Sequence, residues 1–472
     1  MTLLSRAGRT LFWLLLGALV LSSAGLYNGF PLVTSDSGTY LNSAVTLTVP
    51  DDRPVTYGLW VLLTGMRGTL WLVIFAQALL LVGLLWRCIT VFAPRLQHPA
   101  ARLALLAGVT WLTGVSWYCS QLMPDIFTAV GALALALLLL KRSALPEQLL
   151  LLAVLLLSAL MHSSNLLTFL LTVLGVGAVG WQQGLFRRQV LHRPTWLLTL
   201  LVTLAGWGIL PLLHARLGGG FELSKASSAF LMARLSESGV LEKFLQANCG
   251  PQNQYRLCEF RDKLPNDAIT FMWDANSPLN QTGGWNANRA EYQQIIGQVL
   301  RSPRYYPLLV SESVQATLRQ LTHIGHGDGL TAFRENTNPY WKVSEYAPYE
   351  LKEYMSSMQN RSQLDFKDLN ERVYGAHLLA LLVLGVLLLG PWRARIAPAA
   401  VGLVLVCGAA VVSNALVTGS LANVLDRLQG RVSWLLPWAC LLLLAQYLPR
   451  WTPQVAQLLA RDEPPEQPRM PE

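Results

Sequence analysis

Long apolar runs recur along this chain, and they constrain its fold more than any other feature. A helix needs roughly 20 mainly apolar residues to cross a hydrocarbon core of about 30 Å. Ten segments approach that length: 11–27, 69–86, 103–118, 125–140, 147–161, 165–181, 195–213, 374–391, 398–417 and 432–448. A composition of 53% hydrophobic and 13% charged residues argues against a soluble globular protein. The sequence therefore predicts an all-α polytopic membrane protein with about ten transmembrane helices.

Basic residues between the apolar runs predict the orientation. Arg6 and Arg9 precede the first run, which makes the N-terminus cytoplasmic by the positive-inside rule. Strict alternation of ten spans then places every later basic cluster on the same side: Arg87, Arg95 and Arg102; Lys141 and Arg142; Arg187, Arg188 and Arg193; Arg393 and Arg395; and Arg450. The net charge of +9 is thus attributed to topology and not to nucleic acid binding. We expect a multi-pass protein of the cytoplasmic (inner) membrane with both termini cytoplasmic.

The order of apolar and polar stretches divides the chain into four parts. Residues 1–213 hold the first seven predicted helices, including a polar first outer loop at 28–68. Residues 214–373 are predicted to form a mainly helical outer (periplasmic) domain, and 374–448 hold the last three helices. Residues 449–472 form a cytoplasmic tail, and its Pro- and Glu-rich end predicts disorder.

Two of the six cysteines differ from the rest in their surroundings. Cys249 and Cys258 lie in the polar 214–373 stretch, whereas the other four lie in or beside apolar runs. Because the predicted topology places this stretch in an oxidising compartment, a disulfide between Cys249 and Cys258 is expected.

Ionisable residues gather at the predicted outer face. They are Asp36, Asp51, Asp52, Arg53, Asp125, His162, Asp426, Arg427 and Arg431. The interiors of the ten predicted spans contain no Asp, Glu, Lys or Arg. Ion-coupled carriers usually keep an ionisable group near the middle of the bilayer, so this pattern counts against a transporter.

This set of side chains suits sugar transfer from a lipid carrier. Moving a sugar from a polyprenyl phosphate to a hydroxyl requires a carboxylate that takes the acceptor's proton and cations that hold the departing phosphate. Asp36 is the predicted base, with Asp125 as a second catalytic candidate. Arg53, Arg427 and Arg431 are the predicted phosphate ligands, because a planar guanidinium matches phosphate geometry.

The chain resembles the GT-C superfamily of integral membrane glycosyltransferases, which includes the aminoarabinose transferase of lipid A and the protein O-mannosyltransferases. The resemblance lies in the topology and in four short motifs: Asp36 in TSDSGTY, the DDRPVTYG stretch, the Pro124-Asp125 turn, and the loop from Asp426-Arg427 to Arg431 before Trp434-Leu-Leu-Pro437. It implies an inverting enzyme with a polyprenyl-phosphate-linked sugar donor and an envelope glycan, lipid or protein acceptor. Many relatives carry a tight acidic pair in the first loop. Asp36 stands alone and the pair Asp51-Asp52 comes later, so which acid is the base stays open.

Each candidate also has a purely structural interpretation. Asp36 suits an Asx turn, Asp51 and Asp52 suit a helix cap before Pro54, and Asp125 suits a helix start. The arginines suit interfacial anchors or partners of Asp426, and His162 suits a turn cap.

The sequence also leaves a metal site and two other functions as alternatives. His326 belongs to a His-x-x-His-x-Asp pattern that offers metal ligands, but its glycines favour a lid loop. No cofactor is required, and a divalent cation at the acids stays open. The alternative functions are an O-antigen ligase or polymerase that uses arginines and an outer-loop histidine, and a non-enzymatic lipid or glycan transporter.

Overall fold

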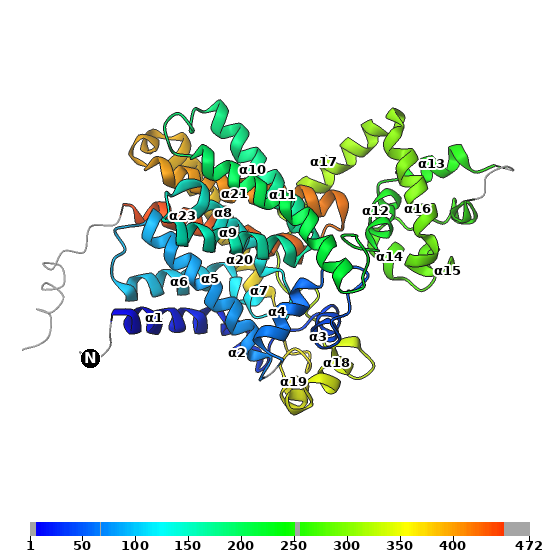
Figure 1. Ribbon diagram of the computed structural model, residues 1–472, viewed down its shortest axis with the longest axis horizontal. Coiled ribbons are helices and arrows are strands. Elements are labelled where there is room, and N and C mark those ends of the chain that lie inside the picture. The colour runs from blue at the N-terminus through cyan, green and yellow to red at the C-terminus, as the bar shows by residue number, and fades with distance from the viewer. Residues whose placement is uncertain (1–5, 67, 251–254, 448–472) are drawn as a thin grey trace, which may run out of the picture.

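The computed structural model describes residues 6–66, 68–250 and 255–447, which are almost entirely helical. Within these ranges the one β-type pairing is an isolated bridge between Leu32 and Gln121. Figure 1 shows a bundle of long helices from which a smaller helical unit projects at one end. The predicted all-α class is confirmed. The predicted disordered tail, 449–472, lies outside the described residues.

All ten apolar segments fold as helices in the bundle. The long helices are α1 (Arg6–Leu21), α5 (Trp71–Phe92), α6 (Pro99–Thr113), α8 (Ile126–Leu140), α9 (Leu145–Met161), α10 (Ser163–Gln182), α11 (Arg193–Arg216), α20 (Lys367–Leu389), α21 (Pro398–Leu421) and the pair α22 (Asp426–Ser433) and α23 (Leu435–Ala445). The Leu- and Ala-rich α8 is buried along its whole length, so it forms the centre of the bundle. A helix that is apolar all round is stable only when it is enclosed in this way or surrounded by lipid.

Six helices of the described chain are long and apolar enough to cross a membrane. They are Trp71–Phe92, Ser163–Gln182, Arg193–Arg216, Lys367–Leu389, Pro398–Leu421 and Asp426–Ala445. Three shorter apolar helices, at Gly8–Leu21, Ile126–Leu140 and Leu145–Met161, match three more predicted segments. The remaining segment, 103–118, is interrupted at Gly114, whose φ of +64° ends α6 before the short α7 (Val115–Cys119). The described part of the chain thus has six candidate spans, and ten crossings remain a prediction.

The last candidate span corrects one expectation. We expected it to begin at 432, but the helix begins at Asp426, so Arg427 and Arg431 lie within it. Arg431 is completely buried. The predicted segment 432–448 still holds no Asp, Glu, Lys or Arg, but the longer candidate span includes Arg431, whose charge the buried Asp125 compensates.

The projecting unit, residues 227–322, has a hydrophobic core of its own. Its elements are α12 (Ser227–Glu237), α13 (Val240–Asn248), η1 (Arg256–Phe260), α14 (Ala268–Trp273), α15 (Pro278–Gln281), α16 (Gly284–Arg301), η2 (Pro303–Tyr305) and α17 (Tyr306–Thr322). Met232, Phe244 and Tyr292 are buried in that core. Cys249 and Cys258 form a disulfide, with their Cα atoms 5.6 Å apart. α17 leads back to the bundle and packs along α21.

The rest of the 214–373 stretch belongs to the bundle. The helices α18 (Asn338–Tyr346), η3 (Pro348–Glu350) and α19 (Leu351–Ser356) lie beside the first polar loop, below the bundle in Figure 1. The short α2 (Ser23–Asn28) leads into that loop, which folds into α3 (Ser37–Thr46) and α4 (Thr56–Thr64). Val343 and Tyr354 are buried in the same core as the bundle helices. The predicted single outer domain is therefore two structures: the projecting unit and a cover over α3.

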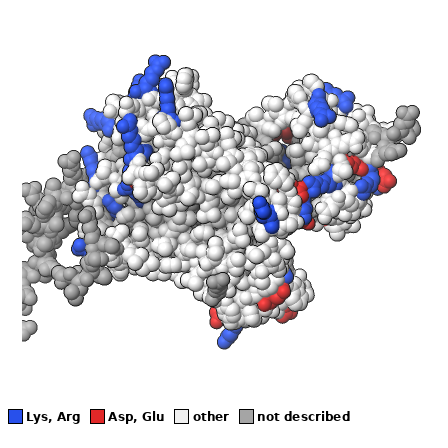
Figure 2. All heavy atoms as spheres, in the orientation of Figure 1, with Lys and Arg blue, Asp and Glu red and all other residues white. Residues whose placement is uncertain are grey.

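Basic residues concentrate at one end of the molecule. Figure 2 shows Lys and Arg over the end of the bundle away from the projecting unit, with no Asp or Glu beside them on this face. The basic connections 141–142 and 187–193 follow the C-terminal ends of α8 and α10. The N-terminal ends of the same two helices hold the candidate site described below.

Candidate functional site

A short backbone pairing brings two predicted acidic residues together. The amide of Leu32 donates to the carbonyl of Ser120 at 2.9 Å, and the amide of Leu122 donates to the carbonyl of Leu32 at 2.8 Å. Asp36 follows Leu32 by four residues, and Asp125 follows Leu122 by three. The first polar loop and the start of α8 are thereby fixed side by side, although they lie far apart in sequence.

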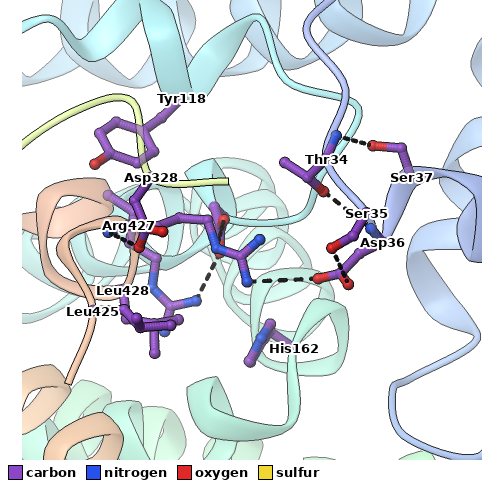
Figure 3. A network of polar contacts seen from close by, with 12 residues as sticks. Thr34, Ser35, Asp36, Ser37, Tyr118, His162, Asp328, Leu425, Arg427 and Leu428 are labelled. Carbon is purple, nitrogen blue, oxygen red and sulfur yellow. Dashed lines mark hydrogen bonds and ion pairs between the residues drawn. The ribbon is translucent and has the colours of Figure 1, made fainter. Parts of the chain in front are cut away.

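Asp36 occupies the turn that starts α3. The hydroxyl of Ser37 accepts from the amide of Thr34 at 2.9 Å and donates to the carbonyl of Leu122 at 3.0 Å, which holds the turn. The Asp36 carboxylate makes no cap hydrogen bond to α3, so it is not occupied by the Asx turn that was the structural alternative. It faces Nη1 of Arg53 at 3.0 Å. On its other side it faces Nη2 of Arg427 at 3.5 Å (Figure 3).

Arg53 is oriented from two sides. Its Nε donates to Oδ1 of Asp52 at 2.9 Å, and its Nη2 pairs with Oδ2 of the same carboxylate. Its guanidinium carbon lies 5.4 Å from the centre of the Tyr40 ring. The role expected of Asp52 as a helix cap is not seen, because Val55 precedes α4 in the cap position. Asp52 instead fixes Arg53 beside Asp36.

Arg427 and Arg431 lie one turn apart on α22 and both approach Asp125. Nη1 of Arg431 donates to Oδ1 of Asp125 at 2.9 Å, and Nε of Arg427 lies 3.7 Å from Oδ2. Residues four apart share a helix face, and because α22 begins at Asp426 the two guanidinium groups meet the same carboxylate. Arg427 also faces Asp36 (Figure 3), so its guanidinium links the two acids.

Further polar groups hold Arg431 in place. Its Nη2 donates to Oγ of Ser164 at 2.9 Å and to Oδ1 of Asn414 at 3.0 Å. His162, at the start of α10, accepts through Nδ1 from the amide of Ser164 at 3.2 Å. Burial, together with the neighbouring Arg431 charge, lowers the pKa of His162 to about 3, so the ring is neutral. Since Nδ1 accepts, the ring proton lies on Nε2 and is available as a donor.

Exposure separates the groups that a ligand can reach from those that it cannot. The side chains of Asp36, Arg53 and Arg427 are 21%, 14% and 18% exposed, whereas Arg431 is 0% and Asp125 1% exposed. Arg431 and Asp125 therefore stay paired with each other, because separating a buried ion pair leaves an uncompensated charge. The reachable part of the site is Asp36 with Arg53 and Arg427.

The charges of the site set the protonation of Asp36. Burial raises the pKa of this carboxyl, but the charges of Arg53 and Arg427 lower it by more, so the pKa lies below its ordinary value. Asp36 is therefore ionised at neutral pH. Burial and the neighbouring Asp36 and Asp52 carboxylates act oppositely on Arg53, and the carboxylates prevail, so its pKa is raised and it stays charged.

Three predicted residues lie outside this network. Asp51 pairs with Lys225 at 3.0 Å and is half-exposed. Asp426 lies 3.3 Å from Nδ1 of His323. His326 is buried, and its Nε2 lies 3.1 Å from the carbonyl of Gly114, so it holds its loop against α7. The geometry gives these residues structural contacts and does not bring them to Asp36.

Two network residues were not among the predicted site residues. Asp328 accepts through Oδ2 from the amide of Arg427 at 3.3 Å, which ties the 323–337 loop to α22. Asn414 bonds both Arg431 and the carbonyl of Leu428. A lone amide within the apolar run 398–417 was the available signal for Asn414.

Neither a bound metal nor a relative adds to this description. Across the residues with described positions, no group of three or more His, Cys, Asp or Glu converges as a metal ion would require. Comparison with protein families, with curated proteins and with solved structures found no match.

Proposed function

We propose that the protein is an inverting glycosyltransferase that moves a sugar from a polyprenyl-phosphate donor to a cell-envelope acceptor. The observation that carries the proposal is the contact of one reachable carboxylate, Asp36, with two reachable guanidinium groups, Arg53 and Arg427. A general base beside phosphate ligands is what such a transfer requires. Asp36 and Arg53 lie in the polar loop between α2 and α5, and Arg427 lies in the first turn of α22, positions that suit a carrier's headgroup at the bilayer surface.

The proposed step needs only these side chains. Asp36 accepts the proton of the acceptor hydroxyl, whose oxygen attacks the anomeric carbon from the face opposite the phosphate. The bond from the anomeric carbon to the phosphate oxygen breaks, and the lipid phosphate departs with the bonding electrons. Arg53 and Arg427 stabilise the negative charge that develops on that phosphate. One displacement inverts the anomeric configuration.

Donor binding would also release the base. In the empty site Arg53 and Arg427 both pair with Asp36, and these contacts lower its pKa. A phosphate that takes over these guanidinium groups weakens their hold on Asp36. The carboxylate then becomes more basic at the moment when it is needed.

Arg431 and Asp125 act as positioning residues in this proposal. Arg431 was expected to bind phosphate and Asp125 to be catalytic, but both are buried and paired with each other. Asp125 also lies near Arg427, so the pair holds that guanidinium facing Asp36. His162 supplies a neutral donor near the site.

The membrane orientation belongs to the same proposal. With the basic connections on the cytoplasmic side, the Asp36 site and the projecting unit face the outside of the inner membrane. The projecting unit and the α18–α19 cover would then select the acceptor, an envelope glycan, lipid or protein.

The decisive experiment compares two substitutions in one loop. Mass spectrometry of envelope glycans from cells with and without the protein identifies the residue mass that it adds. Asp36→Asn should abolish that addition while membrane insertion is unchanged. Asp51→Asn, which removes an equal charge from the half-exposed pair with Lys225, should leave it intact. Full addition by Asp36→Asn would refute the assignment.

A glycan ligase of the O-antigen type is the second candidate, and His323 is the observation that favours it. This residue is partly exposed and pairs with Asp426, directly before Arg427. In such an enzyme His323→Ala should abolish transfer of a preassembled glycan and Asp36→Asn should be tolerated. The opposite pattern would support the first proposal.

A further inference from the structure

A second polar site lies at the opposite end of the bundle. A cavity of about 490 Å³ opens between the connection from α8 to α9 and the connection from α10 to α11. Its polar lining consists mainly of Lys141, Arg142, Gln189, His192, Arg193 and Thr195. Because α8 has 15 residues, the cavity is roughly 22 Å from Asp125 at about 1.5 Å per residue. It is therefore separate from the Asp36 site.

The cavity has positive charge beyond the part that Glu147 offsets. Lys141 is paired with Glu147. Arg142 donates to the neutral amide oxygen of Gln189 at 2.8 Å, and Arg193 lies 5.4 Å from the ring of Trp181. In the part of the chain that the structure describes, Arg142 and Arg193 form no ion pair with a carboxylate. Two guanidinium groups are thus available to an anion.

The first turn of α11 adds backbone hydrogen-bond donors that also favour an anion. This helix of 24 residues begins at Arg193, so its first amides have no acceptor within the helix and its dipole favours negative charge there. The amides of Arg193 and Thr195 are such donors, while Pro194 has none. Backbone amides with guanidinium groups suit the oxygens of a phosphate.

The surface beside the cavity is apolar. Leu145 and Leu149 on α9 are exposed, and so are Leu197 and Leu201 on α11, which packs against α9. Exposed leucines that continue from a basic cavity along two bundle helices match the acyl chains and headgroup of a phospholipid.

We propose that this cavity binds the phosphate of an anionic phospholipid from the adjoining leaflet. Arg142 and Arg193 bind the phosphate oxygens, and the leucines of α9 and α11 contact the acyl chains. A zwitterionic lipid is bound less well, because its ammonium group enters a cavity that already has excess positive charge. The leucine surface favours a lipid over free phosphate, which has no apolar part.

The test uses the full-length protein purified in detergent. Native mass spectrometry counts the lipids that it retains after incubation with phosphatidylglycerol, with phosphatidylcholine, or with phosphatidylglycerol and an excess of inorganic phosphate. The wild type should retain one phosphatidylglycerol in preference to phosphatidylcholine, and inorganic phosphate should not displace it. Arg142→Gln with Arg193→Gln should weaken retention about tenfold or more, since both charge-assisted contacts to the phosphate are lost.

The matched control removes equal charge nearby. Arg187→Gln with Arg188→Gln changes two exposed arginines of the same connection that do not line the cavity, and it should retain the lipid. Equal losses in the two double variants would show attraction by general charge and overturn the proposal. So would equal retention of phosphatidylcholine, or displacement by inorganic phosphate. Thermal unfolding of each variant confirms that the fold is intact.

Discussion

Asp36 is held by two cations, and this has a measurable consequence for its titration. Burial alone would raise the pKa of its carboxyl, whereas Arg53 and Arg427 together hold the pKa below the ordinary value. In the proposed transfer, Asp36 acts as a base only when its carboxyl is ionised. The acidic limb of the pH–activity profile should therefore lie at the pKa of this carboxyl in the folded protein. Removing one cation must move that limb to higher pH.

Arg53→Gln tests this dependence. The variant should have lower activity at every pH, and the acidic limb of its kcat/KM profile should lie at higher pH than in the wild type. Lys225→Gln removes the same charge from a residue that pairs with Asp51 and makes no contact with Asp36, so its profile should match the wild type. An unshifted limb in Arg53→Gln would show that Asp36 is not the titrating base.

The buried pair Arg431 and Asp125 makes a prediction about stability. Arg431→Gln leaves the Asp125 carboxylate with only its longer contact to Arg427, at a cost of up to about 3–5 kcal/mol. The thermal unfolding midpoint should fall clearly. Adding Asp125→Asn should recover part of the loss, because the double variant contains no unpaired charge. The exposed pair Arg261–Asp262 is the control, and Arg261→Gln should change the midpoint little. Strictly additive losses would refute the coupling.

At the scale of elements, the packing of α18 on α3 positions the turn that holds Asp36. A Cβ on Gly38 would lie 2.8 Å from the backbone of Asn338, too close for van der Waals contact. The close approach of the two helices therefore depends on this glycine.

Gly38→Ala should push α18 from α3 and disturb the site. We expect a lower unfolding midpoint and reduced transfer, measured on the same preparation. Gly83→Ala in α5 is the control, since a Cβ there meets no atom within 4 Å. That substitution should be neutral or stabilise by up to about 1 kcal/mol, because alanine favours the helix. Identical behaviour of the two variants would show that the α3–α18 contact is unimportant.

The elements also show how far the sequence alone leads. The apolar runs predict the long helices of the bundle, because helices satisfy their own backbone groups in an apolar setting, but not α16 and α17 of the projecting unit. The early start of α22 was not predictable from its own polar residues. It depends on Asp125, 306 positions away from Arg431, and on Asn414. Likewise, the acids and arginines of the site were recognisable by type. Asp36 is exposed enough to meet a ligand and Asp125 is buried. This difference follows from packing between distant segments, which a local sequence pattern does not predict.

At the scale of the whole molecule, the distribution of charge predicts which end faces which compartment. Glu345 lies exposed on α18 near the Asp36 site, and Arg188 lies exposed at the basic end. The free cysteines Cys88, Cys119, Cys407 and Cys440 are all buried, so they should contribute little background to labelling.

Single-cysteine labelling tests this orientation. In intact spheroplasts a membrane-impermeant maleimide should modify Glu345→Cys and should leave Arg188→Cys unmodified until the membrane is permeabilised. The reverse pattern would place the Asp36 site in the cytoplasm. It would remove the basis for an acceptor in the envelope.

The pairing of Leu32 with residues 120–122 involves main-chain atoms only. The geometry of this pairing therefore depends little on the side chains of Leu32 and of residues 120–122. The spacing of the two carboxylates therefore depends on the main chain at 32 and 120–122 and on the Ser37 hydroxyl. Directed evolution toward another acceptor for the proposed transfer is best aimed at the α18–α19 cover, away from this turn.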